Sequence, residues 1–216
     1  VTIQEDNQSE EDLAEGGDTT EQNDVQNQQE ISYVQMMSKA YEKALTAKKS
    51  VVSVTKGAEQ ENWNAEATGI DESVSGVIVA DNGPEILILS YASICEDAKE
   101  WCVTFSDKSE YKASLKKKDK NSGFAIFAVD KKSLSDATWS ASSVASLGNS
   151  NLTEQGDVIF ALGNIFGYAG GSGYGIVSSS NYKEIGRDGE YSVIATDMSS
   201  ASEGTGILLS LIHISE

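Results

Sequence analysis

Basic residues are absent from the first 30 positions of the 216-residue chain, which hold ten acidic residues. The whole chain has a formal net charge of −18. Because nucleic-acid binding depends on lysine and arginine side chains that neutralise phosphates, this balance argues against a nucleic-acid partner. The one basic run, residues 116–120, contains Asp119 and is typical of a solvated strand end.

Long apolar runs are also absent. No stretch is long and apolar enough to span a membrane, and no signal peptide is visible. Because the chain begins with Val1 rather than Met, we expect any signal or membrane anchor to lie upstream of it. Contact with a membrane is therefore expected only through such an upstream segment.

Residues that commonly hold metals or cofactors are scarce. The chain has one histidine, His213, and two cysteines, Cys95 and Cys102, which lack CxxC spacing. This composition predicts no metal site, and the cysteines are compatible with either a disulfide or two buried thiols. The glycine-rich stretch 163–175 lacks the GK[ST] motif of a phosphate-binding loop, so it predicts turns and no cofactor.

The composition changes several times along the chain. Residues 1–30 have almost nothing to bury and predict a disordered acidic linker. Apolar residues then recur at helical spacing, which predicts an amphipathic helix over 31–49. Short β-type runs follow, in two groups that a Ser-, Asp- and Thr-rich loop joins, and they predict two packed β-units over 50–135 and 136–208. The predicted strands are SVVSVT, SGVIVA, EILILS, WCVTF, EYKASL, FAIFAV, DVIFAL, YGIVSSS, YSVIAT and GILL.

Five longer segments stand in a fixed order. They are SVVSVT, SGVIVADNGPEILILSYASI, FAIFAVD, GDVIFALGNIFGYAGGSGYGIVSS and IATDMSSASEGTGILL. Together they resemble the trypsin-like peptidase family in its bacterial HtrA-type form, whose GD-strand-GNPFG…GIVS signature is the most specific match. The resemblance covers about residues 50–208. It implies an all-β fold, a trypsin-like double β-barrel with the first barrel complete and the second partial, preceded by one short helix.

The family's functional residues map onto positions that have lost their chemical groups. The histidine position holds Ser93, the aspartate position Gly123 and the nucleophile position Thr205. In the family's mechanism the histidine takes the hydroxyl proton and the aspartate orients the imidazole. Ser93 does not titrate near neutral pH and Gly123 has no side chain, so the Thr205 hydroxyl is left without a base. In the oxyanion region, Glu203 stands before Gly204 and puts a negative charge where the family has a glycine.

The resemblance therefore implies a domain without proteolytic activity, and no residue is expected to be catalytic. Its expected partners are polypeptide segments or a related protease, its expected place is the extracytoplasmic surface of a bacterium, and homo-oligomerisation stays open because HtrA relatives are often trimers. Two alternatives remain. One is an active serine-type endopeptidase with an atypical site, in which Thr205 works with a lysine or a water. The other is a structural or adhesive β-domain with the same strand pattern.

The last eight residues, LSLIHISE at 209–216, raise a separate point. They equal the translation of the start of a common transposase-type sequencing adapter, so we expect a non-native tail. Further strands of the second barrel, and the PDZ domain that many relatives carry, are then expected to be missing from the fragment.

Overall fold

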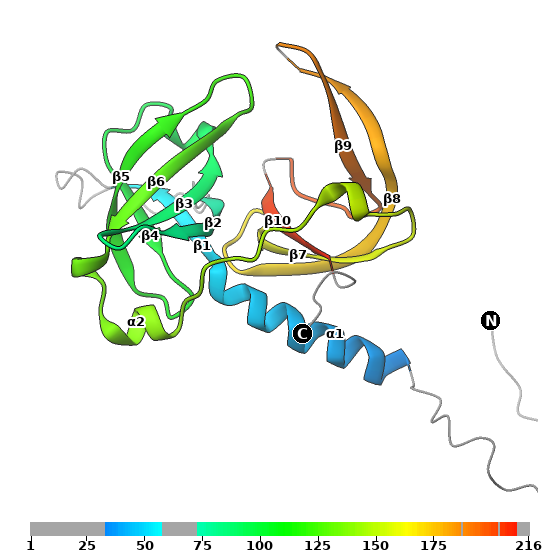
Figure 1. The fold of residues 1–216 in the computed structure, drawn as a ribbon, viewed down its shortest axis with the longest axis horizontal. Coiled ribbons are helices and arrows are strands. Elements are labelled where there is room, and N and C mark those ends of the chain that lie inside the picture. The colour runs from blue at the N-terminus through cyan, green and yellow to red at the C-terminus, as the bar shows by residue number, and fades with distance from the viewer. Residues whose placement is uncertain (1–32, 58–72, 187, 203, 211–216) are drawn as a thin grey trace, which may run out of the picture.

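A computed structural model of the chain describes residues 33–57, 73–186, 188–202 and 204–210 (Figure 1). The predicted acidic segment 1–30, Glu203 and residues 211–216, with His213, lie outside these ranges. Strands dominate the described part, and the all-β fold class is confirmed. No helix in this part is long and apolar enough to cross a membrane.

The predicted amphipathic helix is present as α1 (Tyr33–Ala47), followed by a 3₁₀ turn, η1 (Lys48–Ser50). Figure 1 shows α1 running beneath the second sheet. Its buried Ala44 contacts a cluster that contains Phe160 and Leu162 of that sheet. Small alanine side chains at this face let the helix approach the sheet closely, so α1 covers one face of the second unit.

The first unit is a six-stranded closed barrel in which the strand order is β1-β2-β3-β6-β5-β4 and every pairing is antiparallel. Closure leaves no free sheet edge in this barrel. Its strands are β1 (Val51–Lys56), β2 (Ser73–Asp81), β3 (Glu85–Tyr91), β4 (Trp101–Thr104), β5 (Glu110–Lys118) and β6 (Phe124–Asp130).

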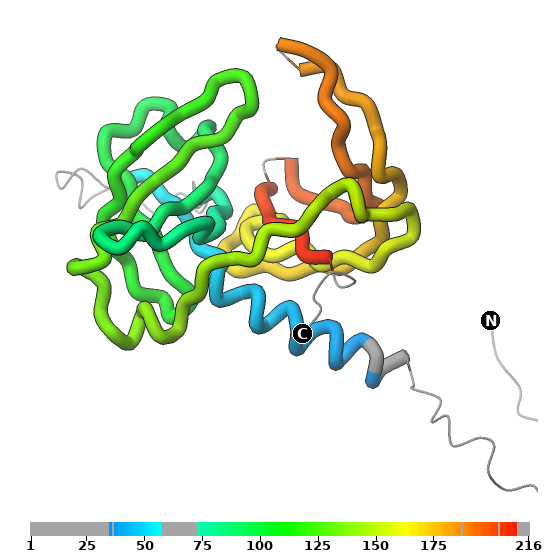
Figure 2. The backbone as a smooth tube through the Cα atoms, viewed as in Figure 1, coloured from blue at the N-terminus to red at the C-terminus, as the bar shows by residue number. Residues whose placement is uncertain are grey.

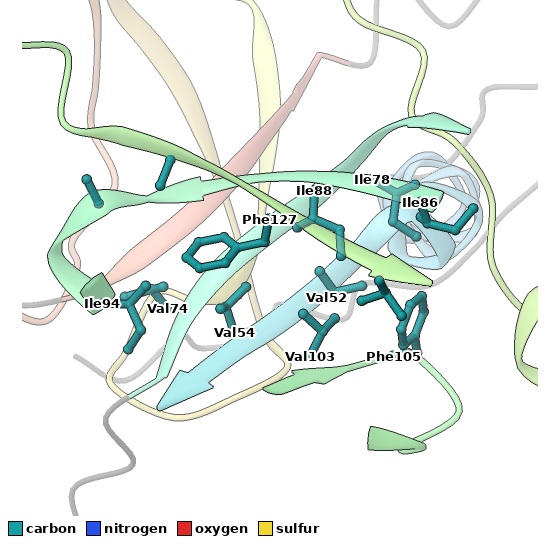
Figure 3. Close-up of a cluster of buried hydrophobic side chains, with 13 residues drawn as sticks. Val52, Val54, Val74, Ile78, Ile86, Ile88, Ile94, Val103, Phe105 and Phe127 are labelled. Carbon is teal, nitrogen blue, oxygen red and sulfur yellow. The ribbon is translucent and has the colours of Figure 1, made fainter. Parts of the chain in front are cut away.

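The barrel interior is filled by β-branched and aromatic side chains, which alternate with less buried residues along β1 and β3. Figure 3 shows Phe127 in the middle of this cluster, near Ile88 and Val54, all three of which are fully buried. Burial of each such side chain stabilises the fold by about 1.5–3 kcal/mol. The first unit therefore has a core of its own.

The segment that joins the two units differs from the predicted loop. It contains the short helix α2 (Asp136–Ser140) between the 3₁₀ turns η3 (Lys131–Ser133) and η4 (Ser150–Leu152). Ser135 caps α2 because its side-chain oxygen accepts a hydrogen bond from the Thr138 backbone N–H. A composition rich in Ser, Asp and Thr predicted a loop, but this cap satisfies an N–H at the start of the helix.

The second unit is an open sheet of order β10-β7-β8-β9. Beyond Ile176 the long strand β8 pairs only with β9, and this two-stranded ribbon rises away from the sheet in Figure 2. Leu209 and Ser210, the first residues of the expected non-native tail, pair with β7. The second barrel is thus partial in the described residues. Its strands are β7 (Val158–Asn164), β8 (Gly171–Ile185), β9 (Glu190–Thr196) and β10 (Thr205–Ser210).

Candidate functional site

The three predicted triad positions are connected through their neighbours in the chain, where the first barrel faces β10. Ser93 lies in the 3₁₀ turn η2 (Ala92–Cys95), which follows β3, and the Ala92 N–H donates to the Gly123 carbonyl at 2.8 Å. Tyr91, one residue before η2, donates from its hydroxyl to the Gly206 carbonyl at 3.3 Å. These hydrogen bonds connect the neighbours of Ser93 to Gly123 and to Gly206, which follows Thr205. We call the place where η2 contacts Gly123 the Ser93 and Gly123 corner.

Tyr91 is at the centre of this arrangement, and the sequence did not single it out. Its ring lies 5.7 Å from the ring of Phe124, measured between centroids, and Phe124 follows Gly123 directly. Phe124 is 43% exposed, so an apolar surface borders the predicted site. The register of β3 with β6, which pairs Tyr91 with Phe124, brings the two rings together.

Ser93 and Gly123 offer no group that moves a proton. The Ser93 side chain is exposed, and its carbonyl accepts the Glu96 N–H at 3.1 Å to close the turn. Gly123 has φ +75°, a left-handed conformation that glycine adopts without strain, and it ends the turn between β5 and β6. Any L-residue at position 123, aspartate included, would be strained in this conformation.

The Thr205 hydroxyl is held by Ser75 on β2 of the first barrel. The Ser75 N–H donates to Thr205 Oγ1 at 2.8 Å, and Ser75 Oγ donates to the Thr205 carbonyl at 2.8 Å. Thr205 Oγ1 in turn donates to Ser75 Oγ at 3.4 Å. Through these reciprocal hydrogen bonds, Thr205, the predicted nucleophile position, connects the two β-units.

Asn164 and Gly163 on β7 complete the polar contact between the units. The Asn164 N–H donates to Ser75 Oγ at 2.7 Å, and the buried Asn164 side chain donates from Nδ2 to the Ser73 carbonyl at 2.6 Å. Gly163 has φ +127°, and a Cβ there would overlap the Ser75 hydroxyl. Sequence reasoning missed these three roles, although Ser75, Gly163 and Asn164 all lie in segments that carried the family resemblance.

Of the predicted oxyanion region, only Gly204 lies within the described residues, since Glu203 does not. The Gly204 N–H donates to the Ala201 carbonyl at 2.9 Å. A Cβ at position 204 would overlap the carbonyl oxygen of Ile165, so the turn requires glycine here. This N–H is engaged inside its own turn.

Neither cysteine supplies an alternative nucleophile. Cys95 and Cys102 are both free thiols, so the disulfide that the sequence left open is not formed. Burial raises the pKa of the Cys95 thiol, although the positive charge of Lys118 acts to lower it. Burial, with a hydrogen bond to Glu110, raises the pKa of Cys102 to about 11. Both thiols are therefore protonated at neutral pH, and a protonated thiol is a poor nucleophile.

The described residues contain no group of three His, Cys, Asp or Glu side chains arranged to hold a metal ion. A small cavity of about 70 Å³ lies between β1 of the first barrel and β7 of the second sheet. Its lining includes Asn164, whose side-chain oxygen Oδ1 has no hydrogen-bond partner among the residues that the structure describes. A cavity of this size with polar lining is suited to ordered water molecules.

Comparison with known proteins agrees with the fold. Residues 74–210 match the profile of the family described as "Trypsin-like peptidase domain". The chain is also similar to "Probable periplasmic serine endoprotease DegP-like" of Pseudomonas savastanoi pv. phaseolicola (strain 1448A / Race 6), with 32% identity over 124 residues. That alignment covers 57% of this chain and 23% of the relative, so the chain spans about a quarter of the relative's length.

Proposed function

The chain belongs to the trypsin-like peptidase family, and we propose that it is a member without proteolytic activity that binds polypeptide segments. One observation carries this proposal. The hydroxyl of Thr205, at the predicted nucleophile position, is hydrogen-bonded to Ser75. The predicted positions of the base and of its orienting carboxylate hold Ser93 and Gly123.

The size of the expected loss follows from the chemistry of the triad. An isolated hydroxyl is a weak nucleophile at neutral pH because nothing takes its proton. Removal of a complete triad lowers the rate by roughly six powers of ten, which equals about 8 kcal/mol of transition-state stabilisation.

Polypeptide binding is supported by the surface that borders the site. Phe124 is 43% exposed beside the half-buried Tyr91, and together they offer an apolar platform for a peptide side chain. The relative named DegP-like is a periplasmic endoprotease by its name, so we place this domain outside the cytoplasm as well. Regulation of a related active protease by competition for polypeptides is the role that fits a binding site without a catalyst.

The test uses the purified chain and fluorescein-labelled β-casein, an unfolded polypeptide. We expect binding in fluorescence anisotropy, weakened at least fivefold in Phe124→Ala, and no cleavage over hours. A fluorophosphonate probe should label neither Thr205 nor Ser93. An active DegP-like protease serves as the positive control for both assays.

Two results would contradict the proposal. Casein cleavage that Thr205→Ala abolishes would identify an active enzyme with an atypical site. Equal casein binding by the unaltered chain and by Phe124→Ala, or no binding, would remove the polypeptide site and favour a structural β-domain.

A further inference from the structure

Lysine residues gather on the β5–β6 hairpin beside the predicted site. Lys117 pairs with Ile126 and Lys118 with Ala125, and these two partners on β6 lie three and two residues after Gly123. The positive charge of Lys118 reaches the Cys95 thiol of η2, which carries Ser93. The hairpin therefore holds positive charge next to the Ser93 and Gly123 corner. It projects upward in Figure 2, on the same side as the β8–β9 ribbon.

Part of this charge is not neutralised within the described part of the chain. Lys116 forms an ion pair with Glu85 at 2.6 Å. Lys117, Lys118 and Lys120 form no ion pair with any residue that the structure describes. Only Asp119 interrupts the three, and its carboxylate accepts the Asn121 N–H at 3.0 Å. We call Lys117, Lys118 and Lys120 the lysine cluster.

The rest of the chain carries the opposite charge. Residues 136–210 hold eight acidic residues and two basic ones, so the second unit repels an acidic segment. Residues 1–30 hold ten acidic residues and no basic one. A segment of this composition is attracted to the strongest local excess of positive charge, because several weak ion pairs add together.

We propose that the acidic segment 1–30 binds the lysine cluster of its own chain. The segment is long enough, because the 32 residues before Tyr33 span about 100 Å when extended. That reach exceeds the diameter of a small domain, about 30 Å. This contact does not depend on the proposed function.

The lysines of α1 are the nearest competitors in sequence. Lys39 and Lys43 lie on the helix that follows the acidic segment, with Glu42 between them. The lysine cluster has three ammonium groups within four residues. An acidic segment that binds there therefore meets a higher density of positive charge than it would at Lys39 and Lys43. Lys39 and Lys43 therefore make a matched internal control.

The test is zero-length cross-linking of the full chain with a carbodiimide, followed by mass spectrometry of the peptides. At 50 mM NaCl we expect the carboxylates of Glu10, Glu11, Asp12 and Glu15 to link to the lysine cluster at least fivefold more often than to Lys39 and Lys43. At 0.5 M NaCl, where the screening length falls to about 4 Å, these links should drop at least fivefold.

A charge-reversal variant separates loss of binding from loss of the reactive amines. In Lys117→Glu, Lys118→Glu, Lys120→Glu the hairpin keeps Lys112 and Lys116, and links to these two should fall at least threefold. In Lys39→Gln, Lys43→Gln the links to the hairpin should stay unchanged. The inference is overturned by links that favour α1, by links that salt does not weaken, or by the absence of links to the hairpin. Links found only between two chains would assign the lysine cluster to a second copy instead.

Discussion

The two β-units of this chain achieve stability in different ways. The first barrel closes on itself around a fully buried apolar cluster that includes Phe127, Ile88 and Val54. The second sheet stays open, and Leu208 on its edge strand is 49% exposed. Its buried apolar side chains are covered by α1 instead, through Ala44 and Phe160. Closure thus gives one unit an independent core, whereas the other depends on its neighbours.

The contact between the units follows from this difference. It includes polar ties, in which Ser75 of the first barrel bonds Thr205 and Asn164 of the second sheet. Such ties have strict geometry, so they fix the position of the open sheet against the closed barrel. The predicted nucleophile position lies in these ties, so the Thr205 hydroxyl has a structural role that needs no catalytic base.

The largest expected effect lies in the first core. Phe127→Ala should lower the free energy of unfolding by about 3–5 kcal/mol, because it leaves a cavity in a closed barrel. Leu208→Ala, on the open sheet, should change it by less than about 0.5 kcal/mol. Urea unfolding followed by circular dichroism measures both. Similar losses in the two variants would contradict the contrast between a closed and an open unit.

Gly163→Ala should have the next largest effect, about 2–3 kcal/mol. A Cβ at this residue overlaps the Ser75 hydroxyl, and φ +127° is a conformation that alanine avoids. Gly148→Ala is the matched control, since a Cβ there meets no atom within 4 Å. Thermal melts of the two variants measure this difference. If both variants kept the melting temperature of the parent, the close approach of the two units at Gly163 would be disproved.

Thr205→Val should cost about 1–3 kcal/mol, because it leaves the Ser75 N–H without its acceptor. Thr205→Ser keeps the hydroxyl and should retain most of the stability. Denaturant titration of the pair distinguishes a structural tie from a catalytic remnant. Equal stability of the valine and serine variants would mean that the hydroxyl does not hold the units together.

The smallest expected effect concerns pH and belongs to the first unit. Hydrogen bonds from the Thr138 side chain and the Ser109 backbone lower the pKa of Asp107. Because the pKa of Asp107 is lower in the folded state than in the unfolded state, where it is about 3.9, the ionised carboxylate stabilises the fold at pH values above about 3.9. This stabilisation is lost as the pH falls through the pKa of the folded state. Asp107→Asn should therefore flatten the loss of stability below pH 4. Identical acid profiles for the parent and this variant, in urea midpoints at pH 7, 4 and 3, would count against that role.

Much of this architecture was predictable because it depends on local pattern. Alternating apolar residues indicated each of the ten strands, and the order of five segments indicated the family and the three positions Ser93, Gly123 and Thr205. Helix α2 was missed because its cap, Ser135, lies in a polar stretch without periodicity. Tyr91 was missed because nothing local marks an aromatic residue that meets β10 across the fold.

By itself, the sequence determined the strand pattern, the helix and the absence of an imidazole and a carboxylate from the predicted triad positions, since each depends on residue identity or short-range spacing. Tertiary structure alone decided the partner of the Thr205 hydroxyl. Thr205 and Ser75 are 130 residues apart in the chain, and only the packing of the open sheet against the closed barrel brings them within hydrogen-bond distance. The direction of a hydroxyl depends on its neighbours in space, and no local pattern encodes them.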